Sequence, residues 1–339
     1  MKKIIVTGGS GFIGTNFINQ QLSCTKNKIL NFDKLTYAGN IINHNENELN
    51  PNYSFIEGDI CDRRKVQDVF SKFKPDVLMN FAAETHVDRS IQNPDIFIET
   101  NVYGILNVLV VSHDWVETNP LFRFIHVSTD EVFGSLSLTD PPFTEQSPYS
   151  PNSPYSASKA SSDFLVRAWN KTYGLPTIVT NCSNNYGPYQ FPEKLIPLII
   201  NNCLNDKTLP IYGDGSNIRD WLYVEDHCTA LNNIVNNGII GQTYNIGGEY
   251  EMRNVDIVKH ICSLLDTIMP REDGKSYTNL IKFVKDRAGH DFRYSVNCSK
   301  IKNELNWKQL ETFETGLKKT VEWYINNQDW CKSIVNKTK

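Results

Sequence analysis

The feature that most constrains this chain is a glycine-rich string near its start, Thr7-Gly8-Gly9-Ser10-Gly11-Phe12-Ile13-Gly14. It lies between an apolar run that predicts a strand and an amphipathic stretch that predicts a helix. Gly9, Gly11 and Gly14 fit the spacing G-x-G-x-x-G. Glycine allows the tight turn and a close backbone approach to a pyrophosphate, while the helix N-terminus offers free N–H groups to the anion. The string therefore predicts a dinucleotide-binding turn at the head of a βαβ unit.

Acidic residues follow at the ends of the next two predicted strands. Asp33 lies 19 residues beyond Gly14, where a carboxylate accepts hydrogen bonds from the adenosine ribose hydroxyls and repels a 2′-phosphate. The sequence therefore favours NAD over NADP. Asp59 and Ile60 end the third predicted strand, where they either contact the adenine or form a simple turn, and the spacing alone leaves both interpretations open.

The first half of the chain alternates short apolar runs with amphipathic stretches. This alternation predicts a parallel sheet covered by helices on both faces, whose strands are continuously apolar because both sides are buried. The expected fold class is α/β, with a Rossmann-type doubly wound parallel sheet. We expect strands at residues 4–6, 28–32, 53–56, 76–81, 122–127 and 177–180, and helices at residues 12–22, 63–73, 96–115 and 155–173.

The pattern becomes irregular after about residue 183, where prolines and glycines interrupt it. Such a sequence predicts a smaller α/β lobe built of loops and short elements. We expect residues 1–183 to form the NAD-binding Rossmann domain and residues 184–339 to form mainly the substrate-binding lobe. A segment at about 221–246 is expected to return to the first domain.

Composition and cysteine spacing exclude several classes of protein. The formal net charge of −4 argues against a protein that coats nucleic acid or an anionic membrane. We find no run of about 18 apolar residues, so we expect no membrane span. The eight cysteines are scattered without C-x-x-C spacing, and the pair His86 and Asp88 makes a poor ligand set. We therefore expect a reduced cytoplasmic protein without a metal.

Tyr155 and Lys159 lie four residues apart on a predicted helix and so share one face. A lysine ammonium near a phenol stabilises the phenolate and lowers its pKa. A tyrosine tuned in this way removes a hydroxyl proton while hydride leaves the same carbon. The motif is common by chance, but downstream of a dinucleotide-binding string it predicts the base of a hydride-transfer reaction.

Thr129, Asp130 and Glu131 stand at the end of the fifth predicted strand. Open α/β sheets bind ligands at the carboxyl ends of their strands. Repulsion and burial separate the pKa values of two adjacent carboxyls, which leaves one as an acid and the other as a base. Elimination of water needs such a pair, whereas simple alcohol oxidation does not. Two carboxylates in a solvated turn are the alternative that the spacing leaves open.

Several strings resemble the extended short-chain dehydrogenase/reductase superfamily and, within it, the dTDP-glucose 4,6-dehydratases. The resemblance covers residues 1 to about 325. The Asp130-Glu131 pair is its most specific part, because related 4-epimerases differ there and related decarboxylases tend to keep the Glu without the Asp. The matching strings are residues 8–14, 33–40, 82–90, 128–131, 155–159, 181–188 and 219–226.

The resemblance implies an NAD-dependent carbon–oxygen lyase of the hydro-lyase class. Tyr155 would deprotonate the glucose 4-hydroxyl as the C4 hydride passes to NAD, with Thr129 holding the C4 oxygen. Glu131 would take the C5 proton and Asp130 would protonate the departing C6 hydroxyl. Hydride would return to C6, giving dTDP-4-keto-6-deoxy-glucose for deoxysugar biosynthesis of the dTDP-rhamnose type.

Two alternatives are weighed against this hypothesis. One is a related nucleotide-sugar 4,6-dehydratase, epimerase or decarboxylase that uses another nucleotide, and the other is an NAD-binding protein without catalysis. The latter has no reason to combine Tyr155, Lys159 and the Thr129–Glu131 string.

The expected site residues fall into three groups. For catalysis we expect Thr129, Asp130, Glu131, Tyr155 and Lys159. For NAD we expect Gly8, Gly11, Phe12, Ile13, Gly14, Asp33, Lys34, Thr36, Asp59, Ile60, Phe81, Ala82, Ala83, Thr100, Ser128, Tyr155 and Lys159. For the nucleotide sugar, chiefly by resemblance, we expect Thr85, His86, Asn184, Lys194, Leu195, Pro210, Ile211, Tyr212, Arg219, Asn254, Arg287 and His290.

The resemblance also implies a homodimer. The predicted helices at residues 96–115 and 155–173 would form a four-helix interface between two copies. Apart from the nucleotide sugar, NAD and a second copy, we expect no further partner.

Overall fold

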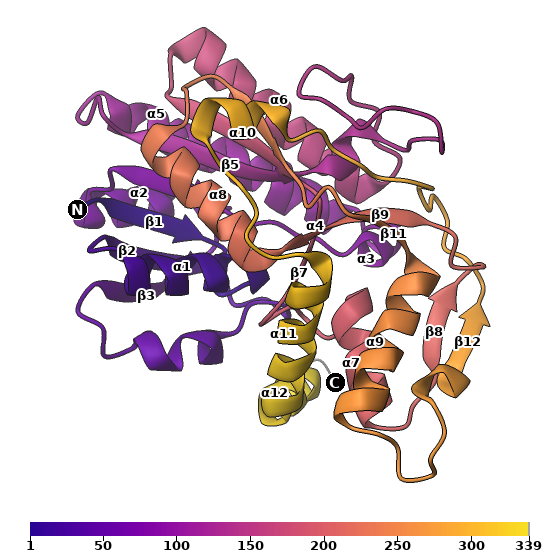
Figure 1. Ribbon diagram of the computed structural model, residues 1–339. Coiled ribbons are helices and arrows are strands. Elements are labelled where there is room, and N and C mark those ends of the chain that lie inside the picture. Colours follow the sequence, from indigo (N-terminus) through magenta and orange to yellow (C-terminus); the bar gives the residue numbers. More distant parts are fainter. Residues whose placement is uncertain (338–339) are drawn as a thin grey trace.

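The computed structural model describes residues 1–337, and its large sheet contains seven parallel strands (Figure 1). Their order is β10-β6-β5-β4-β1-β2-β3, so the chain starts near the middle and winds outwards in both directions. This is the doubly wound α/β arrangement that the alternating pattern predicts, and the prediction is confirmed. The strands are β1 (Lys3–Thr7), β2 (Lys28–Asp33), β3 (Tyr53–Glu57), β4 (Val77–Asn80), β5 (Arg123–Thr129), β6 (Thr177–Cys182) and β10 (Thr243–Ile246).

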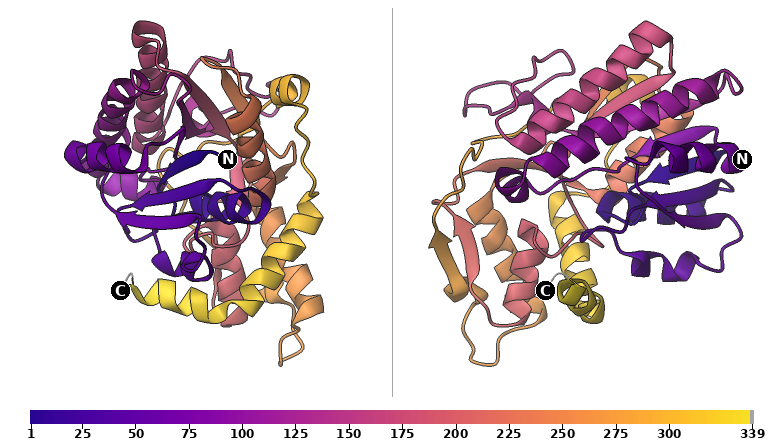
Figure 2. Two further views of the ribbon diagram at one scale, coloured as in Figure 1. Left: turned by 90° about the vertical axis from the view of Figure 1, so that its left-hand side faces the viewer. Right: turned by 180° about the vertical axis from the view of Figure 1, so that it is seen from behind.

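Helices cover both faces of this sheet because successive strand residues point to opposite sides. Ile4 and Val6 of β1 belong to one apolar cluster, with α1 (Phe12–Cys24) and α8 (Val224–Asn237). Ile5 belongs to the other cluster, which lies under the second group of helices. That group consists of α2 (Arg63–Phe73), α5 (Ile105–Val116) and α6 (Pro154–Tyr173). Figure 2 shows α5 and α6 side by side in the view from behind.

The predicted helix at residues 96–115 is interrupted by a wider turn. It consists of α4 (Asp95–Ile98), a π-helical turn η2 (Glu99–Gly104) and α5. The continuous stretch 95–116 is long and apolar enough to cross a membrane by length and composition alone. Half of it is buried, and it packs on α2 and α6, as does a core helix of a folded domain.

The smaller lobe packs beside the carboxyl ends of the large sheet (Figure 1). It has a three-stranded sheet in the order β11-β9-β7 and a two-stranded parallel sheet of β12 and β8. Side chains of its longer helices fill one apolar core. The strands are β7 (Asn184–Tyr186), β8 (Leu209–Tyr212), β9 (Ile218–Tyr223), β11 (Glu251–Arg253) and β12 (Ile281–Val284), and the longer helices are α7 (Leu195–Leu204), α9 (Asn254–Ile268), α11 (Phe313–Asn326) and α12 (Gln328–Lys337).

Two segments from the second half of the chain pack against or pair with the large sheet. Helix α8 packs on α1, and β10 pairs in parallel with β6. Helix α10 (Ser299–Leu305) also packs on β10, and Trp307 joins the same apolar cluster, a return that the sequence analysis did not predict. The division of the chain into domains at residue 183 stays a prediction.

Short helical elements complete the chain and lie in its loops. They are η1 (Ile41–Asn47), α3 (Val87–Gln92), η3 (Asp130–Phe133) and η4 (Tyr277–Leu280).

Candidate active site

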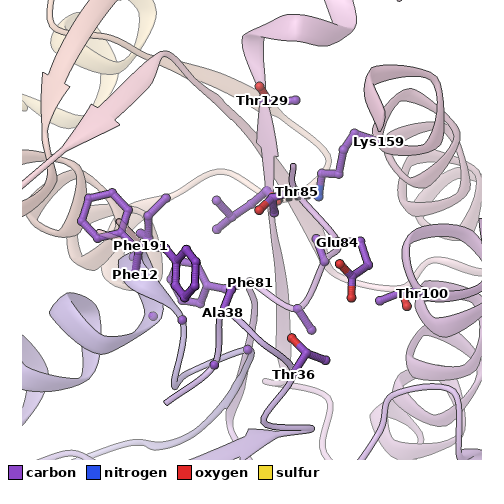
Figure 3. A pocket seen from close by; sticks show the side chains of 18 of the residues that line it. Phe12, Thr36, Ala38, Phe81, Glu84, Thr85, Thr100, Thr129, Lys159 and Phe191 are labelled. Carbon is purple, nitrogen blue, oxygen red and sulfur yellow. Dashed lines mark hydrogen bonds between the residues drawn. The ribbon is translucent and has the colours of Figure 1, made fainter. Parts of the chain in front are cut away.

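A cavity of about 310 Å³ opens at the carboxyl ends of β1, β2, β4, β5 and β6. All of the residues expected to bind NAD and all five expected catalytic residues line it. Figure 3 looks into this cavity: Lys159 reaches in from α6, while Phe12, Phe81 and Phe191 lie on the opposite side. The structure therefore brings the two predicted groups into one site.

The floor of the cavity is a backbone cradle that admits no side chains. Gly8 has φ +69°, and a Cβ atom there would lie 2.6 Å from the backbone nitrogen of Ala82. A Cβ atom on Gly14 would lie 2.4 Å from the carbonyl oxygen of Gly8. Both distances are far below contact distance, so the β1–α1 turn requires glycine at these positions.

The N-terminus of α1 offers unsatisfied N–H groups beside this cradle. Its N-cap residue is Gly11, no side chain caps it, and its first turn contains no acidic residue. The first N–H groups of a helix need a partner, and their partial positive charge favours an anion. Because Gly11, Phe12 and Ile13 line the cavity, this end of α1 fits a pyrophosphate group.

Asp33 is buried at the end of β2 and joins the glycine turn to the next loop. Its Oδ2 accepts a hydrogen bond from the Ser10 N–H at 2.9 Å, and its Oδ1 accepts one from the Leu35 N–H at 2.7 Å. Burial raises the pKa of Asp33, while these two hydrogen bonds oppose the rise. A carboxylate has room for further donors, so Asp33 fits a pair of ribose hydroxyls.

Lys34 and Asp59 form an ion pair in the lining of the cavity. Their charged atoms lie 2.6 Å apart, which ties the β2 loop to the β3 loop. Asp59 also accepts the Cys61 N–H at 2.9 Å. The alternative of a simple turn at Asp59 is thus partly true, because the same carboxylate caps a turn and lines the cavity.

The π turn η2 turns Thr100 towards the cavity. Its neighbour Asn101 is buried and accepts the Glu84 N–H at 2.8 Å, while its Nδ2 donates to the Glu84 carbonyl at 3.0 Å. The same Nδ2 donates to Ser158 Oγ at 2.8 Å. Asn101 therefore fixes the β4 loop against α6, and π turns frequently occur at such sites.

Thr129, Asp130 and Glu131 form the turn that ends β5. The Thr129 hydroxyl accepts the Glu131 N–H at 3.2 Å and donates to Asp130 Oδ1 at 3.3 Å. Asp130 is buried, and its Oδ2 has no hydrogen-bond partner within the described structure. Glu131 is half-buried, so two fully solvated carboxylates are not found, and that alternative is wrong.

The surroundings of the two carboxyls separate their pKa values. Burial, followed by the charges of Glu131 and Asp220, raises the pKa of Asp130 well above its usual value. Burial also raises the pKa of Glu131, but Arg287, Lys194 and Arg219 oppose that rise. Asp130 therefore suits an acid that carries a proton, and Glu131 suits a base.

Tyr155 and Lys159 lie on the cavity-facing side of α6. Burial, followed by the charges of Glu131 and Cys182, raises the pKa of Tyr155 well above its usual value, and a hydrogen bond with Thr129 opposes the rise. The expected lowering of this pKa by Lys159 is therefore not found. Burial and the neighbouring carboxyl charges raise the pKa instead, and the Lys159 ammonium donates to the Val127 carbonyl at 2.9 Å.

Lys194 and Arg287 bring positive charge close to Glu131, although only Lys194 lines the cavity. Lys194 donates to the Thr85 carbonyl at 3.3 Å and lines the cavity, as do Thr85 and Asn184. Arg287 has a buried Nε without a partner within the described structure, and its charge lowers the pKa of Glu131. These cations fit a diphosphate group.

The sequence predicts that the Arg219 guanidinium is free to bind a phosphate group, but the structure differs. It is buried, and it donates to the carbonyls of Ile218, Asp291 and Phe292 at 2.7, 2.9 and 3.3 Å. Its guanidinium lies 4.3 Å from the centre of the Tyr294 ring. Arg219 therefore holds the lobe together, and its expected substrate contact stays a prediction.

The other expected substrate residues lie outside the cavity lining. His86 caps α3, and His290 Nδ1 lies 2.7 Å from Asp286 Oδ1, with its ring against Tyr212. Asn254 begins α9 and has a buried Oδ1 without a partner within the described structure. Their roles stay predictions, as do those of Leu195 at the start of α7 and of Pro210 and Ile211 in β8.

Several lining residues were missed by the sequence analysis. Glu84 follows β4 at its carboxyl end, a position that the strand pattern already marks as functional. Glu193 has no such signal, because only the fold brings its segment to Tyr37, whose hydroxyl donates to Glu193 Oε1 at 3.1 Å. The missed residues are Phe32, Ala38, Gly39, Gly58, Glu84, Val127, Cys182, Ser183, Asn185, Gln190, Phe191 and Glu193.

The described residues contain no cluster of three or more His, Cys, Asp or Glu side chains that could hold a metal ion. We therefore assign no metal-binding residues.

Comparison with known proteins decides the family. The family model described as GDP-mannose 4,6 dehydratase matches residues 5–320. The chain belongs to this family. It is 54% identical to the dTDP-glucose 4,6-dehydratase of Neisseria meningitidis, over 99% of this chain and 97% of that relative.

Solved structures agree with the family. The chain resembles a dTDP-glucose 4,6-dehydratase from Bacillus anthracis in complex with NAD, with a TM-score of 0.88 and 47% identity over 98% of this chain and 100% of that one. It also resembles a dTDP-glucose 4,6-dehydratase from Streptomyces venezuelae with NAD bound, with a TM-score of 0.91 and 41% identity over 98% of this chain and 99% of that one.

Proposed function

We propose that this chain is a dTDP-glucose 4,6-dehydratase, an NAD-dependent hydro-lyase that produces dTDP-4-keto-6-deoxy-glucose. One observation carries the proposal: the adjacent carboxyls of Asp130 and Glu131 line the same cavity as a glycine-rich cradle and the Tyr155–Lys159 pair. The similarity to dTDP-glucose 4,6-dehydratases supports the choice of sugar nucleotide.

The residues of the cavity fit NAD. The uncapped end of α1 would hold the pyrophosphate, Asp33 the ribose, and the loop of Asp59 and Ile60 the adenine. When bound, NAD supplies a hydride acceptor that takes hydride from C4 and later gives it back to C6. The reaction therefore consumes no cofactor.

Tyr155 is the base for the first step. It takes the C4 hydroxyl proton, while the Thr129 hydroxyl holds the C4 oxygen. Burial opposes the phenolate, so the positive charge of Lys159 has to offset it.

Asp130 and Glu131 then remove water across C5 and C6. The 4-keto group acidifies the C5 proton, which Glu131 takes as Asp130 protonates the C6 hydroxyl. The C5–C6 double bond forms as water leaves, and Glu131 returns its proton to C5 when hydride reaches C6.

The cycle leaves a proton imbalance within the site. Tyr155 has gained a proton and Asp130 has lost one, while Glu131 is back in its starting state. One proton therefore has to pass from Tyr155 to Asp130 before the next turnover. Thr129 interacts with both groups, so its hydroxyl offers a short path between them.

The substrate lobe supports a nucleoside diphosphate. Lys194 lines the cavity, and its positive charge and that of Arg287 act on Glu131 there, although the whole chain has a net charge of −4. An epimerase or decarboxylase on another nucleotide is the alternative, and the acid–base pair disfavours it because neither reaction eliminates water.

Incubation with dTDP-glucose, UDP-glucose and GDP-mannose in parallel, without added NAD, tests the proposal. We expect a product lighter by one water from dTDP-glucose, detected by mass spectrometry. No water loss from any of the three, or a 4-epimer as product, would contradict it.

We further propose that two copies pair through α4, η2, α5 and α6. These elements expose apolar side chains, among them Ile98, Tyr103 and Phe164 at 52%, 50% and 55% of their area. Light scattering in solution tests the dimer, and substitution of Phe164 by Glu is expected to weaken it.

We also propose that the protein works in the cytoplasm and supplies deoxysugar biosynthesis of the dTDP-rhamnose type. All eight cysteines are free, as expected in a reducing compartment. Fractionation of cells and analysis of their dTDP-sugars after deletion of the protein test these two statements.

A further inference from the structure

A buried polar network lies behind Lys159, and the proposed reaction does not use it. His126 on β5 and Asp163 on α6 are both fully buried. His126 Nε2 lies 3.5 Å from Lys159 Nζ and 3.4 Å from Asp163 Oδ1. Three ionisable side chains thus meet in the interior, directly beneath the cavity.

Helix geometry places the carboxylate on the catalytic face of α6. Tyr155, Lys159 and Asp163 are spaced four residues apart, so they lie on one side of the helix. That side faces β5, which carries His126 and the Val127 carbonyl that accepts from Lys159. Asp163 therefore lies one turn beyond Lys159 on the same face.

The partners of His126 determine its tautomer. The Thr7 hydroxyl donates to Asn80 Oδ1 at 2.7 Å, so Asn80 Nδ2 donates to His126 Nδ1 at 3.2 Å. The proton of the neutral imidazole is then on Nε2, the nitrogen that faces Asp163. Burial, followed by the charge of Lys159, lowers the pKa of His126 to about 4, which keeps the ring neutral.

Asp163 carries a charge despite its burial. Its Oδ2 accepts hydrogen bonds from the Tyr149 hydroxyl at 2.8 Å and from Asn181 Nδ2 at 3.2 Å. Burial alone acts to raise its pKa, but His126, whose Nε2 lies 3.4 Å from Asp163 Oδ1, and the neighbouring charge of Lys159 outweigh burial and lower it. A buried carboxylate of this kind needs a cation nearby.

We propose that Asp163, held by His126, Tyr149 and Asn181, is a positioning residue that keeps Lys159 protonated and directed at the cavity floor. The proposal deepens the proposed function, since a neutral lysine could not favour the Tyr155 phenolate. The ammonium is buried, and one carbonyl is a weak reason for it to stay charged.

The ionisable groups around Lys159 come from several elements. Burial lowers the pKa of Lys159 to about 8, and the charge of Asp163 is the largest effect that opposes it, followed by that of Cys182 on β6. The other titratable groups near it are His126 on β5, Tyr155 on α6, and Asp130 and Glu131 on η3.

The test measures the ionisation of Lys159 directly in the full chain. Acetic anhydride modifies neutral amines, so brief labelling at a series of pH values, followed by mass spectrometry of the peptides, gives a midpoint for Lys159. We expect a midpoint near pH 8 in the parent. Asp163→Asn should lower it by about one unit, which means about fivefold faster labelling at pH 7.

Lys194 serves as the control within the same samples, because it lines the same cavity. Its labelling curve should not move in Asp163→Asn. An unchanged or raised midpoint for Lys159 overturns the proposal. The measurement needs no sugar nucleotide, so its outcome is independent of whether dTDP-glucose is the substrate.

A second comparison covers the case in which Asp163→Asn does not fold. Lys159→Met leaves the buried Asp163 without its cation, and adding Asp163→Asn removes the unpaired charge. The double variant should therefore melt at a higher temperature than Lys159→Met alone. A lower melting temperature for the double variant contradicts the charge pairing.

Discussion

The Ser10 N–H donates a hydrogen bond to Asp33 Oδ2 at 2.9 Å, and this contact joins the glycine turn after β1 to the end of β2. The carboxylate thereby holds the glycine turn, where we propose that the pyrophosphate binds, in a fixed relation to the proposed ribose position. Its position is determined by the backbone before any ligand arrives.

Asp33→Ala should therefore weaken NAD binding by about 10- to 100-fold, because it removes charge-assisted hydrogen bonds and loosens the turn. The readouts are the NAD content of the purified protein and a calorimetric dissociation constant. Asp62→Ala, which removes a helix cap on the surface, is the control. Unchanged NAD content in Asp33→Ala counts against the ribose role.

Glu131→Gln should stop the loss of water while C4 oxidation survives in part. The amide cannot take the C5 proton, but Tyr155 and Lys159 are untouched. We expect NADH absorbance to appear in a single turnover without a dehydrated product. Asp130→Asn is the matched variant, and it should slow the departure of the C6 hydroxyl. Normal product from Glu131→Gln contradicts its role as the base.

Asp220 should make the stability of the protein depend on pH. Burial raises its pKa to about 7, from an ordinary value of 3.8. The protonated form of Asp220 therefore adds its full contribution to the free energy of unfolding below about pH 4. This contribution is lost as the pH rises from about 4 to about 7. The loss amounts to roughly 4 kcal/mol. Thermal unfolding of the parent and of Asp220→Asn should converge at low pH, with the variant more stable at pH 8. Parallel curves for the two proteins would refute this.

Gly8→Ala should destabilise the protein by several kcal/mol, because the new Cβ atom meets the Ala82 backbone and the residue has positive φ. Gly174→Ala is the matched control. Gly174 has φ +70° at the end of α6, but nothing lies within 4 Å of its Cβ position. Gly174→Ala should therefore lower the free energy of unfolding by only about 1 kcal/mol. Equal melting temperatures for the two variants would show that close packing does not constrain the turn.

The sequence predicts most of the site because its residues lie in short local motifs. The glycine turn, Asp33 and the Asp130-Glu131 pair all stand at the carboxyl ends of strands whose apolar pattern is clear. Asp163 has a comparable signal, four residues beyond Lys159 on the same helix face, and the sequence analysis overlooked it.

Other parts of the site depend on long-range packing and leave no local signal. Arg219 looks like a phosphate ligand in sequence, but the backbone carbonyls of the distant residues Asp291 and Phe292 already accept from it, as does that of its neighbour Ile218. The pKa of Tyr155 depends on carboxyls that only the fold brings near. The π turn η2 interrupts a stretch whose apolar pattern predicts an ordinary helix.

The fate of the C4 hydrogen tests the central claim most directly. Substrate labelled with deuterium at C4 of the glucose should give a product whose C6 methyl group carries one deuterium, without added NAD, as read by mass spectrometry and NMR. Such a result requires oxidation at C4, elimination, and return of the same hydride to C6. Deuterium that is retained at C4 or lost to the solvent would contradict the account.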